Sequence, residues 1–357
     1  FDLITSRFSS NVPLYEKIGN VNVYRVGNFL SRFSFLLPKN FLPIAVFFKA
    51  HRLIAQHGPY DLIHAYQASQ AAGGGWLLKW AYPRIPFLVT VQEGKILTSQ
   101  SVLTRFFRYF IFKKADHATV ISNYLAKYVA SQNKNLPVTV IPNGVDLENI
   151  RKHESGSMNQ ELKEKLGISF QDKVIITVSR LVEKNGIADL IRAMVFIKGN
   201  YSEPTKLLIV GDAEPHLSIE SDLKSLTKEL GLVSNIVFVG AVEHDDVLNY
   251  LSIADVFVRP SRSEGLGTAF LEAMAMEVPI IGTRVGGIVD FLQESQTGLY
   301  CTVGDSQDIG RKIIQILSNR ELHDKLANQG RELVRREYDW DIIVQKFRDI
   351  YETITKN

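Results

Sequence analysis

The chain has 357 residues, which is long enough for two domains, and its 45% hydrophobic and 22% charged residues are ordinary for a globular protein. Its single cysteine, Cys301, excludes an internal disulfide and a cysteine-rich zinc site and fits a reducing compartment. Residues 1–150 carry 16 basic and 7 acidic side chains. The whole chain has 41 basic and 38 acidic residues, so residues 151–357 carry 25 basic and 31 acidic ones. This asymmetry indicates two domains, the first with a basic surface. No signal peptide is visible, and the apolar run at 41–48 is too short to span a bilayer.

The first half of the chain alternates short apolar runs with longer helical segments. Predicted strands lie at 1–5, 21–26, 61–65, 87–91, 118–121 and 138–141, and predicted helices at 44–56, 70–80, 103–114 and 124–132. Such alternation is typical of a parallel sheet whose faces are covered by helices. The polar, turn-rich segment 153–159 is the expected linker to a second domain.

The second half repeats this pattern. Predicted strands lie at 174–178, 206–210, 236–239, 254–259, 279–283 and 298–301, and predicted helices at 160–166, 188–197, 218–230, 245–252, 268–276, 308–318, 320–337 and 340–355. A second α/β domain with a parallel sheet is therefore expected.

Two carboxylates, Glu264 and Glu272, bracket a glycine-containing loop and the start of the helix at 268–276. A helical step of eight residues spans about 12 Å, roughly the reach from the sugar of a nucleotide-sugar to its ribose. Glu264 would then accept hydrogen bonds from sugar hydroxyls and Glu272 from ribose hydroxyls. The backbone amides between them, with the helix dipole, form a natural seat for a diphosphate. These amides belong to Gly265, Leu266, Gly267 and Thr268. Alternatively, Glu264 is a solvated loop acid and Glu272 only compensates the helix dipole.

The run E-G-L-G-T-A-F-L-E-A-M-A followed by P-I-I-G-T-R-V-G-G resembles the E-x7-E region of retaining glycosyltransferases of family 4. This resemblance implies the GT-B fold, in which two Rossmann-like domains hold the site in the cleft between them. It implies an acceptor-binding domain at 1–154, a nucleotide-sugar-binding domain at 155–338, and a C-terminal helix at 339–357 that crosses back to the first domain. Because the family usually begins with an earlier strand and a Gly-rich loop, the first domain is expected to lack its first strand.

A basic loop, SRLVEKNG, follows the strand at 174–178. Ligands of open α/β sheets bind beyond the carboxyl ends of the strands, so Arg180 and Lys184 could reach the same diphosphate. Two cations in a loop are alternatively only solvated. The segment resembles the family's donor-phosphate motif, but Asn185 stands where the family's lysine usually directly precedes the glycine. Lys184 is favoured over Asn185 as the phosphate ligand, because a leaving diphosphate needs charge.

Three further positions are expected near ligands. By resemblance, the strand-end turn at Gly240 lies near the nucleobase, where backbone groups would contact it. Gln92 and Glu93 end the strand at 87–91, where many relatives have a histidine, and could bind acceptor or donor hydroxyls. They could equally be a polar pair that closes the strand. His64, at another strand end, is expected to be structural.

The helix at 103–114, LTRFFRYFIFKK, interleaves basic and aromatic side chains. Basic amphipathic helices lie on anionic membranes, although aromatic residues also suit simple packing against a sheet. Peripheral contact with the cytoplasmic face of a membrane is therefore one of two expectations for this helix, and the chain is expected to be cytoplasmic.

Absent motifs narrow the chemistry. The sequence has no G-x-G-x-x-G after a strand, no P-loop motif, no H-E-x-x-H and no convincing D-x-D metal site. The resemblance implies a retaining hexosyltransferase, and the missing metal motif adds the expectation that it works without a metal or other cofactor. Its donor would be a nucleotide-sugar such as a UDP- or GDP-sugar, and its acceptor a glycan, a lipid-linked glycan or a small molecule; no nucleic acid is expected. By resemblance, Arg180 and Lys184 stabilise the departing diphosphate. The alternatives are a nucleotide-sugar epimerase of GT-B fold and a catalytically silent sugar-nucleotide-binding protein.

Overall fold

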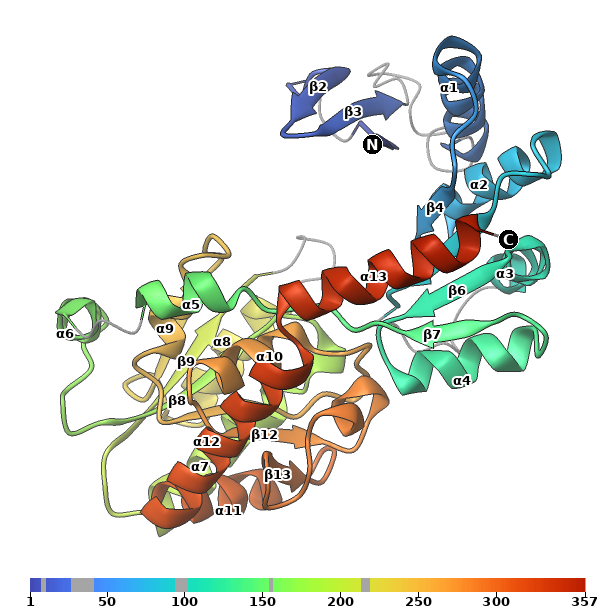
Figure 1. Cartoon of the computed structure of the whole chain (residues 1–357). Coiled ribbons are helices and arrows are strands. Elements are labelled where there is room, and N and C mark those ends of the chain that lie inside the picture. Colours follow the sequence, from blue (N-terminus) through green and yellow to red (C-terminus); the bar gives the residue numbers. More distant parts are fainter. Residues whose placement is uncertain (8–10, 27–41, 94–101, 154–156, 213–218, 357) are drawn as a thin grey trace. The chain divides into compact units, whose positions relative to one another are not determined.

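The structure is a computed structural model that describes the chain except for residues 8–10, 27–41, 94–101, 154–156, 213–218 and 357 (Figure 1). The described residues form two compact units. Unit 1 comprises Phe1–Ile141 together with Gln345–Asn357, and unit 2 comprises Pro142–Val344. The expected linker at 153–159 lies partly outside the described residues. Each unit is an α/β structure, as the alternating sequence pattern predicts.

The main sheet of unit 1 is parallel and has the strand order β4-β5-β6-β7. These strands are Ile63–Tyr66, Phe87–Val91, His117–Val120 and Val138–Val140. The apolar run of β5 is buried along its whole length, as expected of an inner strand with both faces covered. Helix α2 (Gln70–Ala81) packs against β4 and β5, α3 (Val102–Lys114) packs against α2, and α4 (Asn123–Gln132) packs against β6 and β7.

Unit 1 also contains a separate three-stranded sheet. Strands β1 (Asp2–Ser6) and β3 (Val21–Val26) pair in parallel, and β2 (Tyr15–Ile18) pairs antiparallel with β3. Helix α1 (Leu42–His57) contacts both β1 and β3. The sequence pattern does not predict β2, because four residues with little apolar content carry almost no strand signal.

A row of hydrogen bonds crosses the sheet of unit 1. The Nε2 atom of His64 on β4 lies 2.6 Å from Thr90 Oγ1, and that hydroxyl lies 2.6 Å from Thr119 Oγ1. On the other side of the ring, His64 Nδ1 lies 2.8 Å from the hydroxyl of Tyr351, on the part of α13 (Trp340–Thr355) that belongs to unit 1. Burial lowers the pKa of His64 to about 4, so its imidazole is neutral at pH 7. His64 is therefore the structural histidine that was expected.

Unit 2 contains one six-stranded sheet, all parallel, with the order β10-β9-β8-β11-β12-β13. The strands are β8 (Lys173–Val178), β9 (Thr205–Val210), β10 (Ile236–Gly240), β11 (Val256–Arg259), β12 (Ile280–Thr283) and β13 (Gly298–Cys301). The chain reverses its direction of winding between β8 and β11, which lie side by side. A crevice outside the carboxyl ends of strands at such a switch point is the usual ligand site of an open α/β sheet.

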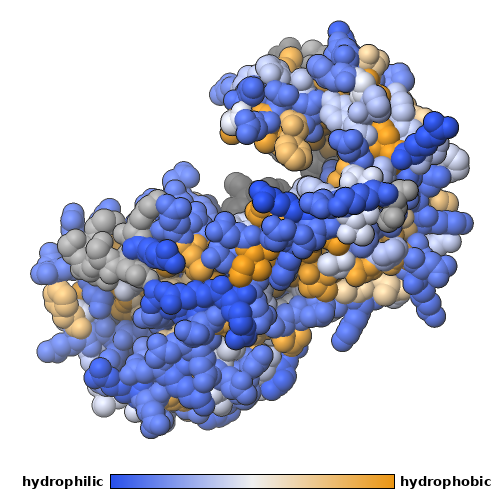
Figure 2. Space-filling view, viewed as in Figure 1, coloured by the Kyte–Doolittle hydropathy of each residue, from blue (hydrophilic) through white to orange (hydrophobic). Residues whose placement is uncertain are grey.

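Helices pack around this sheet (Figure 1). They are α7 (Ile187–Asn200), α8 (Glu220–Glu229), α9 (Val247–Leu251), α10 (Thr268–Ala275), α11 (Ser306–Leu317) and α12 (Arg320–Glu337). Helix α6 (Ser157–Lys165) lies further out, against α9. One buried core joins strand residues such as Ile175 and Val256 to Ile191 of α7 and Ile313 of α11. Burying each such side chain contributes about 1.5–3 kcal/mol. On the face drawn in Figure 2, hydrophilic residues cover most of unit 2.

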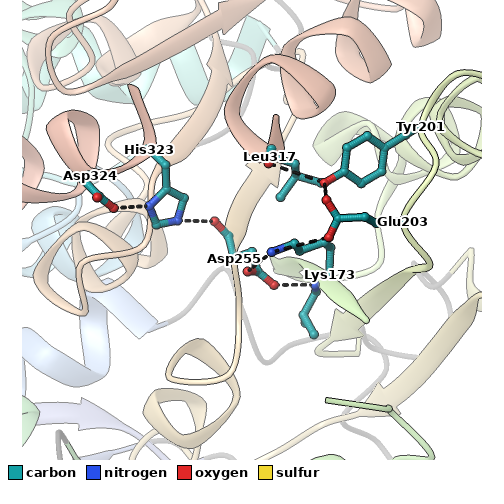
Figure 3. A network of polar contacts seen from close by, with 8 residues as sticks. Lys173, Tyr201, Glu203, Asp255, Leu317, His323 and Asp324 are labelled. Atoms are coloured by element: carbon teal, nitrogen blue, oxygen red, sulfur yellow. Dashed lines mark hydrogen bonds and ion pairs between the residues drawn. The ribbon is translucent and has the colours of Figure 1, made fainter. Parts of the chain in front are cut away.

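A polar network holds the amino ends of the strands of unit 2 (Figure 3). Lys173 Nζ lies 3.9 Å from Asp255 Oδ1 and 3.8 Å from Glu203 Oε2. Asp255 Oδ2 accepts a hydrogen bond of 2.7 Å from the amide of Val174, and the Asp255 carbonyl lies 3.2 Å from His323 Nε2. These contacts stand at the amino ends of β8 and β11, opposite the carboxyl ends at which ligands of such sheets bind.

The compact units divide at Ile141, before the linker expected at 153–159. Helix α5 (Leu147–His153) packs against α9, and Asn149 Nδ2 donates to Asp245 Oδ1 at 3.3 Å, so this segment clusters with unit 2. The expected domain boundary at 154 and the crossing helix at 339–357 stay predictions.

Candidate functional site

Three loops meet at the carboxyl ends of β8, β11 and β12. The carbonyl of Lys184, after β8, accepts a hydrogen bond of 2.7 Å from the amide of Arg262, after β11. The carbonyl of Glu264 accepts one of 3.2 Å from the amide of Gly287, after β12. At Gly286, whose φ is +54°, a Cβ atom would lie 1.7 Å from the Glu264 carbonyl oxygen, so this approach requires glycine. These contacts bring the loops that carry Lys184 and Glu264 together at one edge of the sheet.

Lys184 lies in the short 3₁₀ turn Glu183–Asn185 and directs its ammonium toward the β11 loop. Its Nζ donates a hydrogen bond of 3.2 Å to the carbonyl of Ser263. Burial lowers the pKa of Lys184; the carboxylate of Glu264 opposes this shift, and the nearby cations Arg259 and Arg180 add to it. Lys184 and Arg180 are therefore within electrostatic reach of each other.

Asn185 has a structural place in this loop. Its side chain is only 4% exposed, and its Nδ2 donates a hydrogen bond of 2.7 Å to the carbonyl of Arg180. The amide thus closes the loop between Arg180 and Gly186. Arg180 itself carries an exposed side chain.

Glu264 is held by a residue that no sequence motif identifies. Arg259, the last residue of β11, is buried, and its Nη2 donates to Glu264 Oε2 at 2.8 Å. Its Nη1 donates to the carbonyl of Val178 at 3.1 Å, and its guanidinium lies 4.8 Å from the ring centre of Phe270. The only available sequence signal is an arginine that ends an otherwise apolar strand just before Pro260.

Helix α10 begins immediately after this loop. Gly267 precedes it with a φ of +94°, and no side chain caps the helix. Among the predicted diphosphate amides, that of Gly265 donates to Glu264 Oε1 at 3.1 Å. Gly265, Leu266 and Gly267 are buried, and Thr268 is half-buried. The eight-residue helix points its amino end, with its partial positive charge, at this edge.

Glu272 lies on α10 and is only 7% exposed. Burial raises the pKa of its carboxyl group, while His244 and Arg259 oppose that shift. His244 Nε2 lies 3.6 Å from Glu272 Oε1. His244 belongs to the segment that follows Gly240, whose φ is +84° and whose carbonyl accepts from the Gly211 amide at 2.8 Å. His244 is thus, after Arg259, a second residue that contacts a predicted carboxylate without being part of the predicted site.

Gln92 and Glu93 follow β5 in unit 1. Glu93 pairs with Arg108 of α3, and Arg108 is buried and also donates its Nε to the carbonyl of Ala68 at 2.8 Å. Gln92 is half-buried. The carboxylate of Glu93 therefore has a cationic partner within unit 1, which the sequence pattern does not reveal.

Within the described ranges, no group of three or more histidine, cysteine or acidic side chains is arranged to hold a metal ion. No described helix combines the length and the apolar character that crossing a membrane requires.

Family models match both halves of the chain: Glycosyltransferase Family 4 over residues 2–149 and Glycosyl transferases group 1 over residues 158–333. The N-acetyl-alpha-D-glucosaminyl L-malate synthase of Bacillus anthracis is 30% identical over 308 residues, which are 85% of this chain and 77% of that protein.

Solved structures show the same fold. A sucrose-phosphate synthase from Thermosynechococcus elongatus matches with a TM-score of 0.83 at 23% identity, over 99% of this chain and 88% of that one. Anabaena HepE in complex with UDP and glucose matches with a TM-score of 0.77 at 20% identity, over 93% and 86%. These likenesses confirm the two-domain α/β architecture of GT-B type.

Proposed function

The chain belongs to family 4 of the glycosyltransferases and is itself a glycosyltransferase, and from this membership we propose that it transfers a hexose with retention of the anomeric configuration. The proposal rests on the meeting of Lys184, Glu264 and Glu272 around one buried arginine at the switch point of unit 2. The acceptor oxygen bonds to the anomeric carbon while the bond from that carbon to the diphosphate oxygen breaks. The electron pair leaves with the diphosphate, which takes the acceptor proton.

Each predicted residue has a role in this reaction. Arg180 and Lys184 neutralise the departing diphosphate, because preorganised charge in a partly dry site stabilises a leaving anion. The amides of the loop before α10 seat the same diphosphate. Glu264 orients the sugar, and Glu272 accepts hydrogen bonds from the ribose. Residues of unit 1, including Gln92, serve the acceptor.

The donor is a nucleotide-sugar, and a UDP-sugar is the first to test because a protein of the same fold, Anabaena HepE, is solved in complex with UDP and glucose. A thermal-shift panel of UDP- and GDP-sugars identifies it, since a ligand at 100 times its Kd stabilises the folded state by about 2.7 kcal/mol. No metal is needed in this scheme. Turnover that survives chelation supports that part of the proposal, and turnover restored only by a divalent cation contradicts it.

Transfer is distinguished from the two other candidate functions by its products. A transferase consumes donor in proportion to glycosylated acceptor, an epimerase converts the donor without any acceptor, and a silent binding protein leaves it unchanged. Family membership favours transfer over both alternatives. Donor consumption without acceptor dependence would overturn it.

Replacing Glu272 by alanine is expected to weaken nucleotide binding and leave the fold intact. A hydrogen bond from a ribose hydroxyl to this carboxylate should contribute roughly 1.5–3 kcal/mol. Calorimetry with the nucleoside diphosphate measures the change, with Glu277→Ala as the control, because Glu277 lies just beyond α10 in an ion pair with Arg331. Equal affinity of wild type and Glu272→Ala would exclude the ribose role.

Helix α3 presents an exposed surface that we propose contacts anionic membranes. Arg108 and Phe112 face inward, whereas Phe106 and Phe107 are 56% and 55% exposed. On the neighbouring α2, Trp80 is 63% exposed and lies under Lys114 Nζ, 4.4 Å from its ring centre. Aromatic rings beside basic groups suit the interface of a bilayer.

We expect the protein to sediment with vesicles that contain phosphatidylserine and not with pure phosphatidylcholine, since each basic residue near an anionic surface contributes about 1 kcal/mol. Arg105→Glu on α3 should reduce sedimentation. Lys127→Glu makes the same charge change on an exposed position of α4 and should matter less. Equal, negligible sedimentation with both lipids, or equal effects of the two substitutions, would reject the contact. We also propose that the chain is cytoplasmic, because a single cysteine fits a reducing compartment.

A further inference from the structure

Arg259 occupies the centre of the candidate donor site without being one of its predicted ligands. It ends β11 at the switch point, and its side chain is buried. Its Nη1 donates to the carbonyl of Val178, the last residue of β8, at 3.1 Å, and its Nη2 donates to Glu264 at 2.8 Å. One guanidinium therefore ties the ends of two neighbouring strands to the carboxylate that is to meet the sugar.

The surroundings hold this guanidinium in one place. The ring of Phe270 stacks against it at 4.8 Å, and a Cβ atom on Gly267 would lie 2.8 Å from its Nη2. Glycine at position 267 thus leaves the space that the arginine fills. A planar guanidinium that is hydrogen-bonded through both Nη atoms and packed on an aromatic ring has little freedom to reorient, unlike the ammonium of a lysine.

The same charge acts on the other site residues. Arg259 helps to lower the pKa of Lys184, and it opposes the rise that burial causes in the pKa of Glu272. Arg259 is therefore electrostatically coupled to Lys184, a proposed diphosphate ligand, and to Glu272, the proposed ribose ligand. It is also hydrogen-bonded to Glu264.

The hydrogen bonds of Glu264 leave it fixed but still able to accept. Its Oε2 receives Arg259 Nη2, and its Oε1 receives the amide of Gly265 at 3.1 Å. Each carboxylate oxygen accepts more than one hydrogen bond, so a sugar hydroxyl can still be bound. With the arginine removed, Glu264 would lose the hydrogen bond that anchors its Oε2 atom.

We propose that Arg259 is a positioning residue that holds the Glu264 carboxylate in the orientation needed to grip the sugar of the donor. The proposal rests on the function proposed above. It differs from the roles of Arg180 and Lys184, which act on the diphosphate. Loss of Arg259 should therefore affect the sugar-dependent part of catalysis more than the binding of the nucleotide.

The test is a double-mutant cycle with Arg259→Met and Glu264→Gln, measured with UDP-glucose and UDP. Arg259→Met should lower kcat by about tenfold, because small misplacements of an orienting group are costly. Its affinity for UDP should stay within about threefold of wild type. Because the arginine acts through the glutamate, the double variant should be no slower than the slower single variant. Arg259→Lys should recover part of the loss.

Two controls separate positioning from folding. Arg331→Met removes an arginine that pairs with Glu277 on the surface of unit 2 and should leave kcat unchanged. Thermal melting confirms that each variant is folded, and Arg259→Lys, which keeps a buried cation, serves if Arg259→Met does not fold. Additive losses in the double variant, or a fall in UDP affinity in step with kcat, would overturn the proposal.

Failure of the proposed function looks different. Wild-type protein would then bind UDP-glucose without consuming it. In that case the ratio of Kd for UDP to Kd for UDP-glucose carries the test. If wild type binds UDP-glucose more tightly than UDP and Arg259→Met does not, the positioning role is supported. If Arg259→Met keeps the same preference for UDP-glucose, the role is overturned.

Discussion

Replacing Lys184 by alanine is expected to lower turnover of the nucleotide-sugar about a hundredfold or more, the usual cost of losing one preorganised donor to a developing anion. The ammonium lies at the edge where β8 and β11 end, 3.2 Å from the Ser263 carbonyl and within electrostatic reach of Arg180 and Glu264. A desolvated charge in that place acts strongly on a departing diphosphate, because the low local dielectric weakens screening.

Asn185→Ala is the matched comparison, because the family pattern raises Asn185 as the rival phosphate ligand. In the structure its side-chain amide is turned to the Arg180 carbonyl, at 2.7 Å. Its loss should loosen the loop and reduce turnover mildly, with part of the effect appearing as lower thermal stability. Both variants are to be measured as kcat with folded protein and saturating donor. The reverse ranking would show that Asn185 faces the phosphate and that Arg180 is the phosphate cation on this loop.

Sequence patterns predicted those parts of the site that depend on backbone chemistry. The apolar runs of β8 and β11, the glycines of the following loops and the helix-forming run of α10 fix where amides and strand ends lie. The E-x7-E resemblance then drew attention to Glu264 and Glu272. These signals are local, so a single chain segment carries them.

Partners that come from distant segments could not be found in this way. Arg259 ends a strand, and a charge in that position ordinarily indicates the exit of the chain to solvent, yet here it is buried against Phe270 and Glu264. His244 reaches Glu272 from a different loop. Arg108 had the pattern of a membrane-facing residue, and only the packing of α3 shows that it is buried and paired with Glu93. In each case tertiary contact decides the role of a charged side chain.

Lowering the pH from 7 toward 4 is expected to destabilise unit 1 through His64. Burial holds the pKa of this imidazole at about 4, against about 6.5 in the unfolded chain. The unfolded state therefore binds the extra proton first as the pH falls. The stabilisation is complete above pH 6.5 and is lost progressively between 6.5 and 4. A difference of about 2.5 units at 1.36 kcal/mol each amounts to about 3 kcal/mol in the free energy of unfolding.

The neutral ring explains the geometry. One imidazole nitrogen donates and the other accepts, which suits hydroxyl partners on both sides, Thr90 and Tyr351. Protonation makes both nitrogens donors and places a charge among the rings of Tyr66, Phe347 and Tyr351. Because a doubly protonated ring can no longer accept, one of its two hydroxyl contacts, to Thr90 or to Tyr351, should be lost.

Urea unfolding at pH 7 and pH 5, compared between wild type and His64→Gln, isolates this effect. Two other groups also make the free energy of unfolding depend on pH. Burial raises the pKa of Glu272, whose effect is opposite in sign to that of His64, and lowers the pKa of His117, whose effect has the same sign. Both groups are present in wild type and in His64→Gln, so their effects cancel when the two are compared. Wild type should lose about 2 kcal/mol more than His64→Gln between the two pH values. His117→Gln, at the hydrogen bond to Thr139 on the same sheet, should keep most of the wild-type slope. If the free energy of unfolding changed equally with pH in wild type and in His64→Gln, His64 would be as readily protonated in the folded chain as in the unfolded one.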